Sequence, residues 1–176
     1  MDIKAVNSMS YEEFIDLFGN AVEKCPLIAG AIWSKRPFTT FVDLETSIFE
    51  FIDSLPQTGK EGILRCLPDL AGRELQSGTL SAESQKEQVQ AGLTSLSHEE
   101  QEKLHQFNSL YKNKLGFPFV IAARMSDKSK ILQDLTARIQ NPPLQELYNG
   151  IEEVKKICHL RLQDIHCKHA VRPTNP

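Results

Sequence analysis

Apolar side chains recur every three or four residues along most of the chain, the spacing that places them on one face of an α-helix. Such stripes run through residues 14–22, 44–55, 104–111, 131–139 and 147–165. The one β-like run, Phe117–Ile121, contains Pro118, which cannot donate a hydrogen bond to a neighbouring strand. The pattern therefore predicts an all-α fold of about eight helices.

Start and stop signals set the expected ends of these helices. Three Ser or Thr residues are followed three positions later by Glu, the spacing of a capping box: Ser10–Glu13, Thr58–Glu61 and Ser97–Glu100. Pro56 and Pro68 are expected to end the helices before them, because a proline disfavours helical backbone in the preceding residue. Gly116 is the expected cap of the helix that starts at Ser97. Further helices are expected over residues 81–93, within 126–140, and from the Asn141-Pro142-Pro143 break to about Ile165.

Composition narrows the class of protein. The length of 176 residues fits one domain. We expect this domain to span residues 1–167, with a frayed tail at 168–176.

The net charge of -3 is spread along the chain, which argues against a nucleic-acid-binding face. No apolar run approaches the roughly 20 residues needed to span a bilayer, and the start, residues 1–4, lacks the pattern of a secretory signal. We therefore expect a soluble intracellular protein whose four cysteines, none of them in a Cys-x-x-Cys pair, are reduced thiols.

Two polar features stand out against the helical pattern. Ser84, Glu87 and Gln88 share one face of the helix expected over 81–93; spacing alone favours a solvated face over a hydrogen-bonding wall of a pocket. Arg161 continues the apolar stripe of the last helix. Either it is buried, which requires an acidic partner or an anionic ligand, or Leu162 carries the stripe and Arg161 reaches water.

Two irregular segments are further candidates. Residues 116–124 are apolar where a polar loop is expected, and their backbone N–H groups need acceptors, which a ligand rich in carbonyl or carboxylate oxygens would supply. The alternative is a buried loop leading into a helix that begins near Val120. Leu67 ends a helix just before Pro68, a rigid position of the kind that often carries catalytic groups. The alternative there is a core leucine.

Together these segments resemble the family that decarboxylates 2-oxo-4-hydroxy-4-carboxy-5-ureidoimidazoline (OHCU). The matching stretches are residues 14–38, closing with Trp33-Ser34-Lys35-Arg36-Pro37-Phe38; Pro68-Asp69-Leu70-Ala71-Gly72; Ser84-Gln85-Lys86-Glu87-Gln88 with Ala91-Gly92-Leu93; residues 108–124, containing Gly116-Phe117-Pro118-Phe119; and residues 138–162, containing Asn141, Glu146, Glu153 and Arg161-Leu162. The family's motif His-Pro-x-Leu-Ala-Gly has Leu67 here in place of its histidine, the family's acid/base.

The resemblance implies a cofactor-free enzyme without a metal, which converts OHCU to (S)-allantoin in urate degradation. It implies a catalytic site at position 67 with Glu87 and Arg161. The implied substrate-binding residues are Pro68, Ser84, Gln85, Lys86, Glu87, Gln88, Phe119, Val120, Ile121, Ala122, Ala123 and Arg161. It also implies a homodimer and, in vertebrates, a peroxisomal location, although the end of the chain, Pro173-Thr174-Asn175-Pro176, is not the Ser-Lys-Leu address.

Leu67 changes the expected activity, because a leucine cannot transfer a proton. General acid–base groups contribute about 10²–10⁴-fold in rate, so we expect severely reduced turnover. An enzyme with a lone cysteine nucleophile is a weak alternative, because no cysteine has a motif neighbour that suggests activation. Two further rival interpretations remain. One is a non-catalytic helical module that binds a ureide or a purine breakdown product. The other is a zinc site among Cys158, His159, His166, Cys167 and His169, although these lack the spacing of paired zinc ligands.

Overall fold

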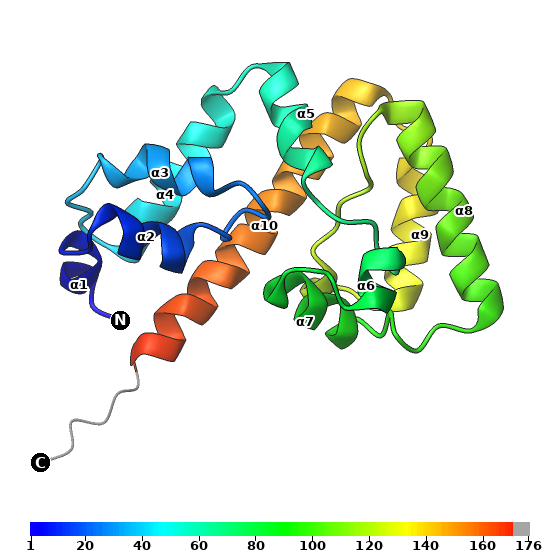
Figure 1. Ribbon diagram of the computed structural model, residues 1–176. Coiled ribbons are helices and arrows are strands. Elements are labelled where there is room, and N and C mark those ends of the chain that lie inside the picture. Colours follow the sequence, from blue (N-terminus) through cyan, green and yellow to red (C-terminus); the bar gives the residue numbers. More distant parts are fainter. Residues whose placement is uncertain (171–176) are drawn as a thin grey trace, which may run out of the picture. The chain divides into compact units, whose positions relative to one another are not determined.

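The computed structural model describes the backbone of residues 1–170 and the side chains of residues 1–168, and its regular structure is entirely helical in that part (Figure 1). Its elements are α1 (Ile3–Asn7), α2 (Tyr11–Phe18), α3 (Pro26–Trp33), α4 (Phe41–Ser54), α5 (Gln57–Arg65), α6 (Arg73–Ser77), α7 (Ala82–Gln90), α8 (His98–Leu115), the 3₁₀ turn η1 (Ala123–Met125), α9 (Lys128–Arg138) and α10 (Pro143–Ala170). The predicted all-α class is confirmed. None of the described helices has the length and apolar content needed to cross a bilayer.

The described part of the chain has ten α-helices, more than the stripes alone suggest. Helices α1 and α6 have five residues each, too few for a period to show. Helix α3 has the sequence PLIAGAIW, which is apolar nearly all round and therefore has no polar face to contrast with a stripe.

Most of the predicted ends are confirmed. Capping boxes are present at Ser10 and Ser97, and Gly116 ends α8 in the left-handed conformation with φ 80°. Helices α4 and α5 end before Pro56 and Pro68. The capping box predicted at Thr58 is wrong: α5 begins at Gln57, directly after a proline whose fixed φ suits a helix start, so Thr58 lies inside the first turn.

Other helix ends differ by three to five residues from those expected. Helices α2 and α7 end at Phe18 and Gln90, earlier than expected, and α10 continues past Ile165 to Ala170. The first residues of the expected tail, 168–170, thus form the end of α10, and residues 171–176 lie outside the described part of the chain.

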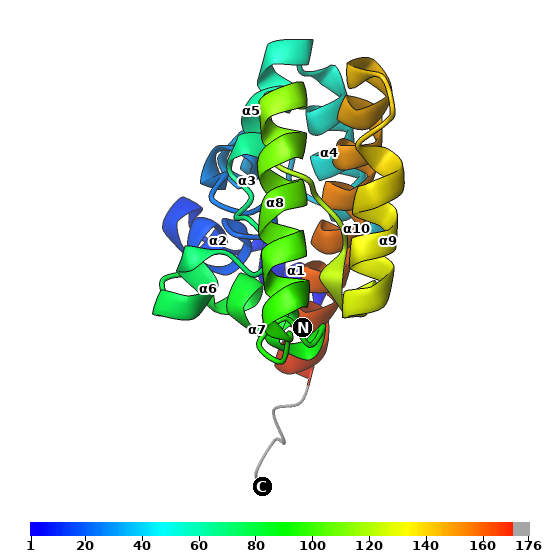
Figure 2. The ribbon, with the colours of Figure 1, turned by 90° about the vertical axis from the view of Figure 1, so that its right-hand side faces the viewer.

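The helices form two compact units. One comprises residues 1–56 with the α10 residues from Lys155 onward; α3 packs there against both α2 and α4 around Phe14, Ile32 and Leu44. The other comprises residues 57–154, where α8 packs alongside α9 (Figure 2). In that unit α10 and α5 approach each other closely at Gly150. A Cβ added at Gly150 would lie only 3.0 Å from the Leu64 side chain.

Candidate active site

Leu67 sits on an irregular turn that follows α5. Its N–H donates to the Leu64 carbonyl at 3.1 Å, and its side chain is half-buried rather than part of the core. Four residues later Ala71 has φ 53°, a left-handed conformation that non-glycine residues adopt rarely. A turn of this kind persists only where surrounding contacts fix it.

Gln88 of α7 is one such contact. Its side-chain oxygen accepts the Ala71 N–H at 2.9 Å, and its side-chain nitrogen donates to the Asp69 carbonyl at 3.4 Å. The Gln88 amide is therefore occupied by the turn, and it ties α7 to the segment that presents Leu67 and Pro68.

Two amides from α8 hold the same turn from a second helix. Asn108 donates to the Leu70 carbonyl at 3.1 Å, and Gln101 donates to the Ala71 carbonyl at 3.0 Å. With Gln88 they hold three successive carbonyls, so side chains from two helices replace the regular backbone pairing that this turn lacks.

The polar face of α7 is buried, so its interpretation as a solvated face is wrong. Ser84, Glu87 and Gln88 are 4%, 9% and 2% exposed. The cause is tertiary, because α7 packs against η1. Gln85 is half-buried and Lys86 is exposed, so the structure places Lys86 apart from the buried face.

The segment from Phe117 to Ala123 is buried and irregular. Each of its five residues from Phe119 onward is at most 6% exposed. The alternative expected a buried loop that leads into a helix near Val120. The loop is buried, but the helix start is wrong, since the chain stays irregular until η1 begins at Ala123. Among the described residues, the backbone N–H groups of 119–123 donate no hydrogen bond to another protein atom. They are candidate donors to a ligand, as the sequence predicts.

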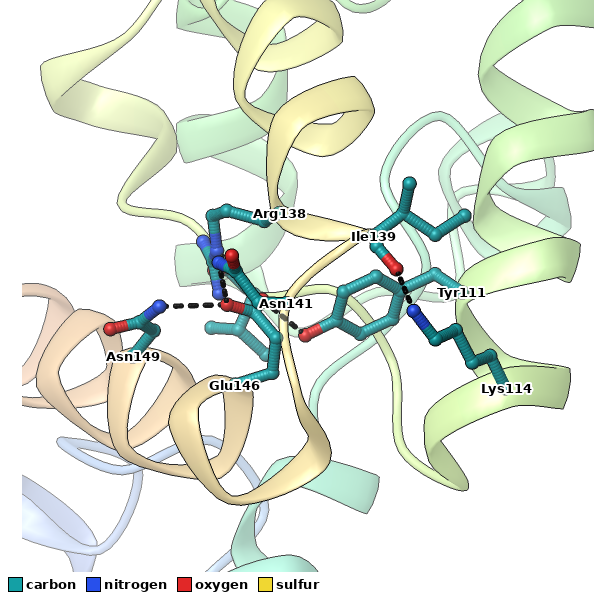
Figure 3. Close-up of polar contacts among 8 residues, drawn as sticks. Tyr111, Lys114, Arg138, Ile139, Asn141, Glu146 and Asn149 are labelled. Carbon is teal, nitrogen blue, oxygen red and sulfur yellow. Dashed lines mark hydrogen bonds and ion pairs between the residues drawn. The ribbon is translucent and has the colours of Figure 1, made fainter.

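Sequence reasoning assigned no role to Glu146, which is the most buried carboxylate of the unit at 0% exposed. Four groups donate to it (Figure 3): the Tyr111 hydroxyl at 2.7 Å and Arg138 Nε at 2.8 Å to Oε1, and the amides of Asn141 at 3.0 Å and Asn149 at 2.7 Å to Oε2. Glu146 lies in the first turn of α10, where an acidic residue ordinarily indicates a solvated carboxylate near a helix N-terminus. Its burial was therefore not visible in the sequence.

Protonation follows from this arrangement. Burial opposes ionisation of Glu146, but the hydrogen bonds from Asn141, Tyr111 and Asn149 and the charge of Arg138 outweigh it and lower the pKa of this carboxyl. Burial and the adjacent carboxylate raise the pKa of the Tyr111 hydroxyl. Tyr111 is thus a neutral donor to an ionised carboxylate.

Arg161 belongs to the other unit, and it is buried at 3% exposed. Its Nη1 donates to the Asn20 carbonyl at 2.9 Å, and its Nη2 pairs with the Glu23 carboxylate at 3.4 Å. The interpretation of Arg161 as a buried cation with an acidic partner is confirmed, and its alternative as a water-exposed residue is wrong. Leu162 is buried as well. Three of the four predicted segments therefore lie together in residues 57–154, and Arg161 lies with its partners in the other unit.

The described residues contain no group of three or more His, Cys, Asp or Glu side chains able to hold a metal ion. Of the five residues considered for zinc, Cys158 is buried and Cys167 is exposed, while the His169 side chain lies outside the described part. Burial raises the pKa of the Cys158 thiol to about 12, which disfavours the thiolate that zinc requires.

Comparison with known proteins gives matches of three kinds: a family model, named relatives and a solved structure. The family model described as OHCU decarboxylase matches residues 7–163. Proteins named 2-oxo-4-hydroxy-4-carboxy-5-ureidoimidazoline decarboxylase are 61% identical in Xenopus laevis, over 94% of each chain, and 57% identical in Mus musculus, over 97% of this chain and 96% of that one. The crystal structure of an (S)-allantoin synthase has the same fold, with a TM-score of 0.75 and 24% identity over 94% of this chain and 54% of that chain.

Proposed function

The chain belongs to the OHCU decarboxylase family, and on that premise we propose that it binds OHCU and converts it to (S)-allantoin, with turnover severely reduced by Leu67. The observation that carries the proposal is the packing of the buried polar face of α7 against η1, next to a run of backbone N–H groups that find no protein acceptor among the described residues. A small ligand rich in oxygen and nitrogen fits such a wall.

The reaction needs little from the protein beyond orientation and one proton. The carbon–carbon bond to the carboxylate breaks, CO2 leaves, and the bonding electrons pass into the neighbouring imine-like group of the ring. A proton is then added to the ring carbon, and the face to which it is added sets the handedness of allantoin. Because the substrate accommodates its own electrons, the residues act by positioning and by electrostatic stabilisation.

Each predicted segment has a part in this scheme. The N–H groups of residues 119–123 bind carbonyl or carboxylate oxygens of the substrate. Glu87, Ser84 and Gln85 form hydrogen bonds with the hydroxyl and ureido groups of the substrate. Pro68 and the turn held by Gln88 shape the wall beside position 67. For Arg161, which pairs with Glu23 in its own unit, a role toward substrate oxygens is proposed from the family resemblance alone.

Position 67 is where the proton would be exchanged. An imidazole there titrates near neutral pH and suits this step. Leu67 fills much of the same volume but has no proton to give, so the site is expected to bind ligand without efficient turnover.

The first test compares this chain with its Leu67→His and Leu67→Asn variants. The decay of freshly generated OHCU is followed by absorbance, and the product enantiomer by circular dichroism. We expect Leu67→His to accelerate conversion about 10²–10⁴-fold over this chain. Leu67→Asn, which is polar but does not exchange protons near neutral pH, should stay close to this chain. Equal rates for all three would remove position 67 from the chemistry and make Glu87 the leading candidate.

Leu67 itself favours one alternative, a non-catalytic module that binds a ureide or a purine breakdown product. Calorimetry with (S)-allantoin separates the two functions. Tight binding by this chain together with no turnover by Leu67→His supports the alternative, and turnover by Leu67→His contradicts it.

The family resemblance supports two further proposals, one on assembly and one on location. The chain is proposed to form a homodimer, which sedimentation velocity would test. It is also proposed to reside in peroxisomes, which imaging of a tagged protein beside a peroxisomal marker would test.

A further inference from the structure

The Phe119–Ala123 backbone is proposed above as a ligand wall, yet only its last residue, Ala123, belongs to a regular element, the turn η1. Its own sequence is apolar and contributes no polar side chain that could fix the peptide groups. Something outside the segment must therefore fix their orientation, since peptide groups that line a site act well only when they are pre-organised.

We propose that Glu146 and Arg138 are positioning residues, which orient the Phe119–Ala123 peptide groups through a hydrogen-bond relay from Glu146 to Arg138 to the Val120 carbonyl. The inference rests on the proposed function for what that segment binds. The relay itself is a matter of geometry within residues 57–154.

Glu146 is fitted to hold another residue rather than to bind substrate. Its two oxygens accept four hydrogen bonds, which matches the roughly four acceptor sites of a carboxylate. With no acceptor site left over and 0% exposure, it acts on the site only through its partners.

Arg138 is the partner that reaches the segment. Its Nε donates to Glu146 at 2.8 Å, and its Nη1 donates to the Val120 carbonyl at 2.8 Å. Its guanidinium also lies over the Phe119 ring, 4.5 Å from the ring centre. Because the guanidinium is rigid and planar, a carboxylate that fixes one edge fixes the direction of the other.

The orientation of the Val120 carbonyl has a direct consequence for the next residue. A peptide group is planar and trans, so its C=O and the following N–H point in opposite directions. Holding the Val120 carbonyl against Arg138 therefore turns the Ile121 N–H away from Arg138. That N–H is one of those without a protein acceptor among the described residues.

A second contact supports the relay from the aromatic side. Tyr111 donates its hydroxyl to Glu146 at 2.7 Å, and its ring meets the Phe119 ring edge-on at 5.5 Å between centres. Phe119 thus contacts both Arg138 and Tyr111, which are both bonded to Glu146.

The same cluster offers a matched control. Asn149 donates to Glu146 at 2.7 Å, as short a bond as the one from Tyr111, but within the described part of the chain it forms no hydrogen bond or ion pair with residues 117–125. An Asn149→Ala variant removes one bond to the buried carboxylate and leaves the relay intact. If Glu146 and Arg138 served stability alone, Asn149→Ala would behave like the variants of Arg138.

The experiment uses the full chain with Leu67→His, alone and combined with Arg138→Lys, Glu146→Gln or Asn149→Ala. Amide hydrogen exchange of residues 119–123, the melting temperature, kcat and KM for OHCU are measured for each. Lysine keeps the charge but is a point donor that cannot bridge Glu146 and Val120 as a fork does. Arg138→Lys and Glu146→Gln should speed exchange in the segment and lower kcat about 10²-fold, the scale of a small misplacement in a site. Asn149→Ala should lower the melting temperature with exchange in the segment and kcat little changed.

The inference is overturned if Arg138→Lys and Glu146→Gln change kcat and segment exchange no more than Asn149→Ala does at a similar loss of melting temperature. If one of the two relay variants does not fold, the other decides. The proposed function fails separately, when the Leu67→His parent neither turns over OHCU nor binds (S)-allantoin. Exchange in the segment then still reports whether the relay orients the backbone.

Discussion

At the scale of single residues, buried charges are the distinctive feature of this chain. Glu146 and Arg161 are both almost completely buried, and each is hydrogen-bonded to a residue far away in the sequence, Glu146 to Tyr111 and Arg161 to Glu23. A charge taken out of water costs several kcal/mol unless such partners replace its hydration. These side chains are therefore sensitive points, both for stability and for the site.

The pair between Arg161 and Glu23 gives a first prediction. Glu23→Gln should lower the free energy of unfolding by about 3–5 kcal/mol, because it removes the carboxylate from a buried guanidinium. Asp53→Asn, which disrupts the Lys155–Asp53 pair where Asp53 is 56% exposed, should cost less than about 1 kcal/mol. Urea unfolding of the two variants beside the parent measures the difference. Similar losses would mean that Arg161 does not depend on Glu23.

Glu146 gives a prediction about pH. Its folded pKa lies below the ordinary value of 4.5, so its contribution to stability is complete above 4.5 and is lost as the pH falls through the folded pKa. The difference in unfolding free energy between the parent and Glu146→Gln should thus be constant near neutral pH and shrink in acid. Urea titrations at several pH values would show this. A difference that grows in acid would contradict the assigned direction of the shift.

At the scale of elements, neighbouring residues in the sequence set where a helix begins and ends, but they do not set which of its faces is buried. The α8 helix illustrates the ends: a capping box at Ser97 starts it, and a left-handed Gly116 stops it. The α7 helix illustrates the faces, because a stretch rich in polar residues is buried where it packs on η1.

Two glycines should respond to alanine with opposite signs. Gly116 has φ 80°, so Gly116→Ala should cost about 1–2 kcal/mol. Gly62 lies inside α5, where an added Cβ would meet no atom within 4 Å, so Gly62→Ala should gain about 0.5–1 kcal/mol. Thermal unfolding of both variants tests the pair. A stabilised Gly116→Ala would mean that α8 does not end in the left-handed turn described above.

At the scale of the whole molecule, the candidate residues divide between the two compact units. Position 67, the α7 face and the 119–123 segment belong to residues 57–154, whereas Arg161 belongs to the other unit. All four cysteines are free thiols, as the sequence predicts, and they give a means to follow each unit in solution.

Cysteine reactivity should separate the folded chain from the unfolded one. Cys167 is exposed and should react readily with a thiol reagent in native buffer. Cys158 is 0% exposed and burial raises its pKa to about 12, so it should react only after unfolding, since the thiolate is the reactive form. Labelling with and without denaturant, followed by peptide mass spectrometry, identifies the sites. Labelling of Cys158 at the native rate of Cys167 would mean that its unit opens locally without global unfolding.

Local patterns in the sequence predict the helical class, most of the helix ends and the segments that resemble the OHCU decarboxylases. These depend on neighbours within a few residues: the period of a stripe, a capping serine, a proline or a glycine. Where such signals were short or absent, as in α1, α3 and α6, the sequence did not indicate the helix. Thr58 failed as a cap because the helix had already begun at Gln57.

Which polar side chains are buried, and what they bind, depends on tertiary packing. Spacing favoured a solvated face for Ser84, Glu87 and Gln88 and left Arg161 open, whereas packing buries all four. Glu146 shows the reason most clearly. An acidic residue in a first turn is equally suited to water or to a ring of donors, and its partners at positions 111 and 138 come from other helices. Burial and pairing are non-local properties, set by which elements meet, and no local pattern specifies that meeting.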